Sequence, residues 1–125
     1  MQTDTQRTAS QQTIDAIELL MSQGQVAQAI EKAISTLKQF PNSYYLWNIL
    51  GISAAQLGKL DLAKNAFEVS TKINKQFLDG YNNLGNILRT QQKFDEAVAA
   101  YRRALDLNPS FAEAHNNLAM SLKET

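Results

Sequence analysis

The sequence lacks cysteine entirely, and it contains one histidine, two prolines and five glycines among its 125 residues. The absence of cysteine excludes a disulfide framework, a thiolate metal site and a cysteine nucleophile. No apolar run approaches the roughly eighteen residues that a membrane-spanning helix requires. Residues 1–12 are rich in glutamine and threonine and lack the apolar stretch of a signal peptide. We therefore expect a cytoplasmic protein that does not enter a membrane.

An excess of charge of either sign is also missing. Twelve lysines and arginines are balanced by twelve aspartates and glutamates, which gives a formal net charge of zero. Proteins that bind nucleic acid need clustered basic side chains, because the release of counterions from the phosphate backbone drives that binding. The sequence has no such cluster, so we expect no nucleic-acid partner.

What the sequence does contain is a repeat of 34 residues. Identical residue types recur at positions 34 apart, or 68 apart, which is twice 34, in five separate sets. Agreement of five sets on one period indicates internal repetition of a structural unit. The sets are Pro41 and Pro109; Gly24 and Gly58; Ala29, Ala63 and Ala97; Leu50, Leu84 and Leu118; and Asn48, Asn82 and Asn116.

Each period has room for two helices of ordinary length joined by short connections. Apolar residues recur at three- and four-residue spacing, and the abundant alanine, leucine and glutamine favour helix over strand. We predict one all-α domain over residues 10–125, with repeats at 10–43, 44–77 and 78–111, a terminal helix at 112–124, and a disordered segment at residues 1–9. The helices are expected at residues 10–23, 25–39, 43–57, 60–74, 78–91, 94–107 and 111–123.

Two spaced sets of large and small residues stand at equivalent places in the second and third repeats: Trp47-x-x-Leu50-Gly51-x-x-Ala54 and Tyr81-x-x-Leu84-Gly85-x-x-Leu88. Both sets resemble the tetratricopeptide repeat, the second more closely than the first. The resemblance covers residues 10–125 and implies a right-handed superhelical solenoid of antiparallel helix pairs. It also implies that the first helix of each pair lines a concave face, which solenoids use as a binding surface.

The resemblance implies a protein-protein interaction module, an adaptor or scaffold, that holds a peptide or partner protein in the concave groove. Asparagine amides both donate and accept hydrogen bonds, so a row of them can hold an extended peptide by its backbone. Alternatively, some asparagines only satisfy neighbouring groups, and we expect this of Asn83 and Asn117 because each stands beside a core leucine. The candidate binding residues are Tyr45, Asn48, Ile52, Asn82, Asn83, Asn86, Arg89, Asn116, Met120 and Lys123.

Some members of the family grip the C-terminal carboxylate of chaperone tails with lysine, arginine and asparagine side chains. That clamp does not carry over to this sequence, because no lysine or arginine stands at a matching position. We therefore expect no binding to heat-shock chaperone tails. The matching positions hold Ile14, Glu18, Ile49, Asp79 and Asn83 or, one repeat later, Asn48, Ile52, Asn83, Glu113 and Asn117.

Residues suited to chemistry are sparse. The single histidine, His115, occupies the place that Trp47 and Tyr81 hold in earlier repeats, so we interpret it as a packing residue that replaces an aromatic ring. A catalytic base needs a nucleophile and an orienting acid within reach. Glu113 is two residues from His115, which places it on another side of the helix. We expect a protein that is not an enzyme and that binds no metal and no cofactor.

The last predicted helix resembles the first half of a further repeat rather than a polar capping helix. The side that would receive a second helix is expected to stay partly bare, although Leu118, Ala119 and Leu122 pack inward. Two alternatives to a free-standing adaptor follow. The chain is the N-terminal portion of a larger protein, since bacterial proteins of similar sequence often place such repeats ahead of a transferase domain, or it forms a homodimer through this helix.

Overall fold

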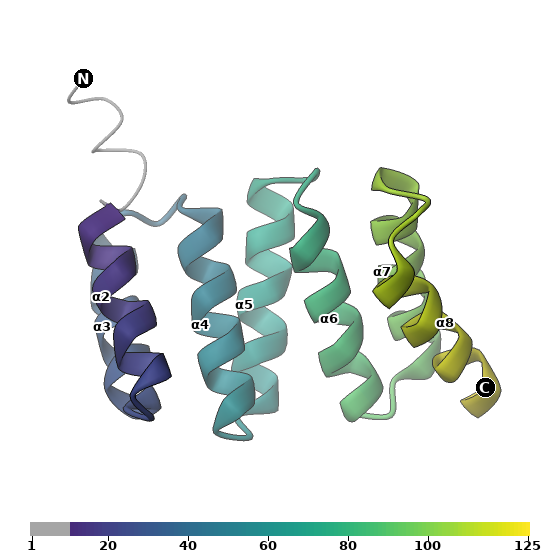
Figure 1. Ribbon diagram of the computed structural model, residues 1–125, viewed down its shortest axis with the longest axis horizontal. Coiled ribbons are helices and arrows are strands. Elements are labelled where there is room, and N and C mark those ends of the chain that lie inside the picture. The colour runs from purple at the N-terminus through teal and green to yellow at the C-terminus, as the bar shows by residue number, and fades with distance from the viewer. Residues whose placement is uncertain (1–10) are drawn as a thin grey trace.

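The computed structural model describes residues 11–125, and that part of the chain contains seven helices and no strand (Figure 1). The prediction of a disordered segment at residues 1–9 lies outside the described residues. The predicted all-α fold is confirmed, and each helix ends within about one residue of its predicted bounds. The helices are α2 (Gln11–Ser22), α3 (Val26–Gln39), α4 (Tyr44–Gln56), α5 (Leu60–Ile73), α6 (Leu78–Thr90), α7 (Phe94–Leu107) and α8 (Ala112–Glu124).

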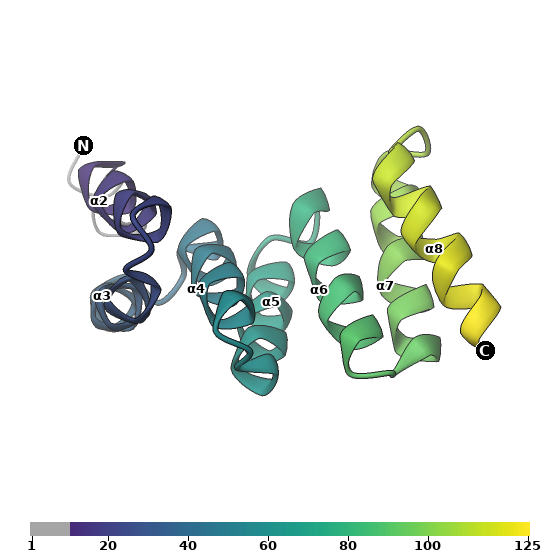
Figure 2. The ribbon, with the colours of Figure 1, turned by 60° about the horizontal axis from the view of Figure 1, so that its bottom comes forward.

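The helices pack as pairs that follow one another in a row. α2 pairs with α3, α4 with α5 and α6 with α7, and α8 packs on α7. The first helices of successive pairs also touch, because α4 contacts both α2 and α6, and α6 contacts α8. Contact among the first helices places them on the inner side of the curve. Figure 2 shows the helix axes turning progressively along the row, so the molecule is the predicted solenoid, with a concave face lined by α2, α4, α6 and α8.

Two glycines allow the helices of a pair to approach closely. The ring of Phe67 in α5 lies against Gly51 in α4, where an added Cβ would come within 2.7 Å of the ring atom Cδ1. The ring of Tyr101 in α7 lies against Gly85 in α6 in the same way, also with 2.7 Å to Cδ1. Both rings are almost fully buried. The alternation of a small residue with a large one across each pair therefore sets the distance between its helices.

The turns inside the repeats need a left-handed backbone, and the sequence supplies it. Gly24 and Gly58 have φ angles of 79° and 74°, and Gln92, at the equivalent place in the third repeat, has a φ of 64°. After Gly58 the amide of Lys59 donates to the carbonyl of Ala54, which closes the end of α4. Glycine adopts this conformation without steric cost. Gly24 and Gly58, which the repeat of 34 residues relates to each other, therefore follow the ends of the first helices of their repeats.

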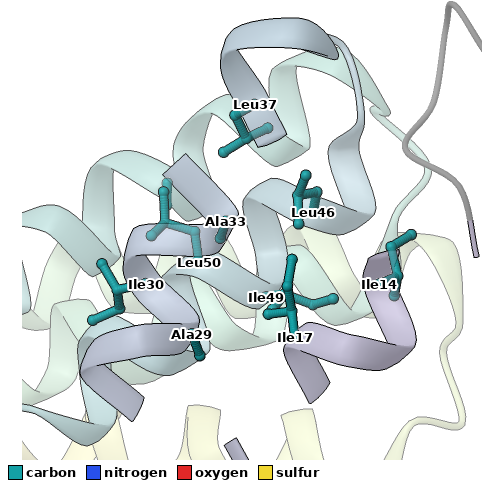
Figure 3. Close-up of a cluster of buried hydrophobic side chains, with 10 residues drawn as sticks. Ile14, Ile17, Ala29, Ile30, Ala33, Leu37, Leu46, Ile49 and Leu50 are labelled. Carbon is teal, nitrogen blue, oxygen red and sulfur yellow. The ribbon is translucent and has the colours of Figure 1, made fainter. Parts of the chain in front are cut away.

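The buried core begins in the first repeat. That repeat has no aromatic residue at the place of Trp47 and Tyr81, and no glycine at the place of Gly51 and Gly85. Figure 3 shows apolar side chains of α2, α3 and α4 converging on one cluster. Ile14 is 6% exposed and Ile49 is 2% exposed. Ile14 stands at a position that matches the family's carboxylate clamp, which predicts that it faces the groove; this prediction is wrong, because its side chain packs into the core. The labelled members are Ile14, Ile17, Ala29, Ile30, Ala33, Leu37, Leu46, Ile49 and Leu50.

Candidate functional site

The ten candidate binding residues lie on α4, α6 and α8, which are three of the four helices that line the concave face. Their exposure differs widely. Tyr45 is 40% exposed and Met120 is 52% exposed, whereas Asn48 and Asn82 are only 5% and 4% exposed. Asn116 and Lys123 are exposed, and the others are half-buried: Ile52, Asn83, Asn86 and Arg89. The concave face therefore presents a subset of the predicted residues rather than the whole set.

Most of the asparagines are engaged with one another. Asn83 donates from Nδ2 to Oδ1 of Asn48 over 3.0 Å, and Asn117 donates from Nδ2 to Oδ1 of Asn82 over 3.4 Å. Each bond joins first helices of neighbouring repeats at a sequence separation of 35 residues. Since buried amides must be hydrogen-bonded, these bonds satisfy groups that the packing of α4, α6 and α8 removes from water. Asn83 and Asn117 thus make the structural contacts that we expected of them, while the burial of Asn48 and Asn82 leaves little amide surface for a peptide.

Asn86 connects this network to the second helix of its own repeat. Its Oδ1 accepts from the hydroxyl of Tyr101 over 2.6 Å and from Nδ2 of Asn117 over 3.1 Å. Burial raises the pKa of Tyr101, the nearby charge of Arg89 lowers that pKa, and the charge of Glu113 raises it. Asn86 is half-buried and its Nδ2 has no hydrogen-bond partner within residues 11–125. Asn86 therefore retains a donor for a ligand.

A hollow of about 300 Å³ opens on the concave face between α4 and α6, and we call it the concave hollow. Its walls are mainly apolar, and the ring of Phe67 reaches it from α5. This volume is at the lower end of the range for small-ligand pockets. Sequence reasoning identified Ile52, Asn83 and Asn86 here. Phe67 is a buried core residue whose ring also borders the hollow, which a pattern of apolar residues in the sequence does not indicate. The lining residues are Ile52, Ala55, Gln56, Phe67, Asn83, Asn86 and Ile87.

Tyr45 lies among carboxylates at the start of α4. Its hydroxyl donates to Oε2 of Glu18 over 3.1 Å. Partial burial raises the pKa of Tyr45, and the hydrogen bond and charge of Glu18 and then the charges of Asp79 and Asp15 raise it further. Within the described part of the chain no lysine or arginine forms an ion pair with these three acids. We call Asp15, Glu18 and Asp79 the acidic edge of the groove.

Basic side chains stand at the ends of two of the first helices, α6 and α8. Arg89 and Lys123 are 34 positions apart, in the last turns of α6 and α8. Arg89 contacts the sulfur of Met120 from Nη1 at 3.5 Å. The two residues form a basic row along the ends of α6 and α8, and α6 carries an acid, Asp79, in its first turn and a base, Arg89, in its last.

His115 has a structural partner. Its Nε2 lies 2.7 Å from the carbonyl oxygen of Pro109, and Trp47, 68 positions earlier, donates from Nε1 to the carbonyl oxygen of Pro41 over 2.8 Å. The imidazole therefore stands in for the indole N–H at the entrance of a first helix, which requires a proton on Nε2.

No group of three or more potential metal-ligating side chains occurs within the described residues. The helices of this region also include none that is both long enough and apolar enough to cross a membrane.

Two family models match the chain. One, described as tetratricopeptide repeat, matches residues 14–70, and the other, described as TPR repeat, matches residues 85–124. Together they cover parts of every repeat and the terminal helix. A comparison with curated proteins finds no match to the sequence.

Several solved structures share the fold. The first TPR of Spaghetti (RPAP3) bound to an HSP90 peptide is 22% identical, with a TM-score of 0.86 over 94% of this chain and 95% of that one. The Arabidopsis OM64 TPR domain is 18% identical, with a TM-score of 0.87 over 94% of this chain and 97% of that one. MamA is 20% identical, with a TM-score of 0.85 over 90% of this chain, which spans only 61% of MamA.

Proposed function

Because the chain belongs to the tetratricopeptide-repeat family, we propose that it binds an extended segment of a partner protein along its concave face. Members of this fold are interaction modules, and their stacked repeats create a continuous surface that no single repeat provides. The concave hollow is the observation that carries the proposal, since it is an open apolar cavity on the face that the fold exposes to partners. A side chain of the bound segment fills it, and neighbouring polar groups orient the segment.

Structures with this fold support the mode of binding. The first TPR of Spaghetti (RPAP3) was solved bound to the HSP90 peptide SRMEEVD, and the second TPR domain of human RPAP3 in complex with the HSP70 peptide SGPTIEEVD. The present chain keeps the architecture but carries acids and apolar residues where a carboxylate clamp needs cations. Its groove is therefore suited to a segment of different charge.

The test of this proposal is capture of partners from the source cell with wild type and with two variants. Ala55→Arg places a long side chain in the concave hollow, and Ala99→Arg makes the same change on the outer helix α7, where Ala99 is exposed. We expect a partner that binds wild type and Ala99→Arg but is lost with Ala55→Arg, with all three proteins equally helical and equally stable. A partner that binds all three equally would contradict the groove assignment.

Self-association through α8 is a second candidate function. Ala54 in α4 and Leu88 in α6 are 0% and 4% exposed because a second helix covers each, whereas Leu122, at the equivalent place in α8, is 45% exposed. Two copies related by a two-fold axis can cover this face for each other, because an isologous contact uses the same surface on both.

Light scattering across a concentration series tests the second candidate. We expect a mass that rises from 13.9 kDa toward twice that value with concentration, and a return to the monomer mass in Leu122→Lys. A wild-type mass that stays at 13.9 kDa throughout would exclude self-association.

A further inference from the structure

The concave hollow and Tyr45, which the acidic edge surrounds, both involve α4, but at different heights along that helix. Tyr45 is in its first turn, and Ile52 and Ala55 follow in its second half. Seven residues separate Tyr45 from Ile52, which is about 10 Å along the helix axis at 1.5 Å per residue. When one residue of a bound peptide places its side chain in the hollow, nearby residues of the same peptide can therefore reach the surroundings of Tyr45.

The surroundings of Tyr45 have the chemistry of a cation site. Tyr45 is 40% exposed, it lies on a helix that lines the concave face, and its hydroxyl donates to Glu18. Carboxylates from two other helices, α2 and α6, act on the same ring. An exposed aromatic face attracts an ammonium or guanidinium group, and carboxylates form charge-assisted hydrogen bonds with it. No lysine or arginine of residues 11–125 forms an ion pair with these acids, so within that part of the chain their charges are left for a cation of the ligand.

We infer that the groove prefers a peptide segment with a lysine or arginine about three residues from a large apolar residue, the cation against Tyr45 and the acidic edge and the apolar side chain in the concave hollow. The spacing follows from the 10 Å separation, because an extended chain advances about 3.3 Å per residue. Charge complementarity selects this occupant over an acidic tail, since carboxylates facing carboxylates are repelled. The inference rests on the proposed function, which supplies the groove but not the identity of the ligand.

Selection from a phage-displayed library of random peptides on the full chain tests the inference without assuming a sequence. We expect enriched peptides to carry Lys or Arg about three residues from Leu, Ile, Phe or Met. The acidic peptide SRMEEVD, used as a direct probe, is expected to bind much more weakly than the enriched peptides. Enriched peptides that are neutral or acidic would overturn the inference while leaving the proposed function intact.

Fluorescence anisotropy with an enriched peptide then assigns the cation to the acidic edge. The double variant Glu18→Gln with Asp79→Asn removes two charges, while the new amide oxygen of residue 18 can still accept the Tyr45 hydroxyl. We expect its affinity to fall about tenfold or more, as for the loss of charge-assisted hydrogen bonds, and the wild-type affinity to fall with added salt. The control, Glu96→Gln with Asp106→Asn on the outer helix α7, removes the same charge and is expected to leave affinity unchanged.

The two hypotheses fail in different ways. Equal affinity of the acidic-edge variant and its α7 control would overturn the cation assignment alone. A library that yields no enriched peptide, or peptides whose binding survives Ala55→Arg, would overturn both the proposed function and the inference that depends on it.

Discussion

Replacing Phe67 by alanine is expected to lower the free energy of unfolding by about 3–5 kcal/mol, the usual cost of removing a fully buried phenylalanine ring. Phe67 is 2% exposed and packs with Ala54, Ala63 and Ile87 at the contact between the second and third repeats. Small domains have total stabilities of about 5–15 kcal/mol, so this loss is a large fraction of the whole. The ring also contributes to the wall of the concave hollow, so the variant loses part of its binding surface as well.

Urea denaturation followed by far-UV circular dichroism measures this change, because the extrapolated free energy compares variants directly. Phe94→Ala is the matched control. Phe94 is half-buried at the first residue of α7 and belongs to none of the buried clusters, so we expect a much smaller loss. A loss below about 1 kcal/mol for Phe67→Ala, the range of ordinary substitutions, would show that the ring does not hold these repeats together.

Replacing Gly51 by alanine is expected to destabilise the protein by about 1–3 kcal/mol through overpacking. Helix propensity alone would make this change stabilising, because alanine is favoured over glycine inside a helix by about 1 kcal/mol. The sign of the change in unfolding free energy therefore tells whether overpacking outweighs propensity. The added Cβ would lie 2.7 Å from both Cδ1 and Cζ of Phe67, and the buried ring has little room to move. The steric cost therefore exceeds the gain in helix propensity.

A double-mutant cycle separates these two terms. In a Phe67→Leu background the side chain at position 67 is shorter, so the further change Gly51→Ala is expected to cost less than it does in wild type. Ala119 occupies the equivalent place in α8, where it is exposed, and Ala119→Gly should show helix propensity alone. A stabilising effect of Gly51→Ala in wild type would contradict the close approach of α4 and α5.

The fold was predictable because its determinants repeat. The pairing of a glycine with an aromatic ring occurs at Gly51 with Phe67 and at Gly85 with Tyr101, at the same separation of sixteen residues. Left-handed turns recur at Gly24 and Gly58. Repetition turns weak local preferences into one consistent pattern, which is why helix ends could be placed closely.

The candidate site was less predictable. The repeat of 34 residues indicates which residues lie on the concave face, but it does not indicate the hydrogen-bond partner of each polar side chain there. Asn48 and Asn82 are on the predicted face, yet the next repeat covers them and accepts or donates their hydrogen bonds. The burial of Ile14 was not predictable either, because the first helix of its repeat has no aromatic residue that would indicate which side packs in the core. The acidic edge depends on residues from α2 and α6 meeting at Tyr45, and sequence spacing alone does not give that convergence.

The asparagine bonds between first helices lie where the curvature of the molecule is set. Substantial contacts among the described helices join elements no more than two apart along the row, so the two ends communicate only through the intervening steps. At the bond between Asn48 and Asn83, and again at the bond between Asn82 and Asn117, one amide spans the inner side of the curve. The curvature of the groove is therefore set one step at a time, by the contacts between neighbouring first helices. A partner that spans α4 and α6 meets one of these steps, the one that the bond between Asn48 and Asn83 crosses.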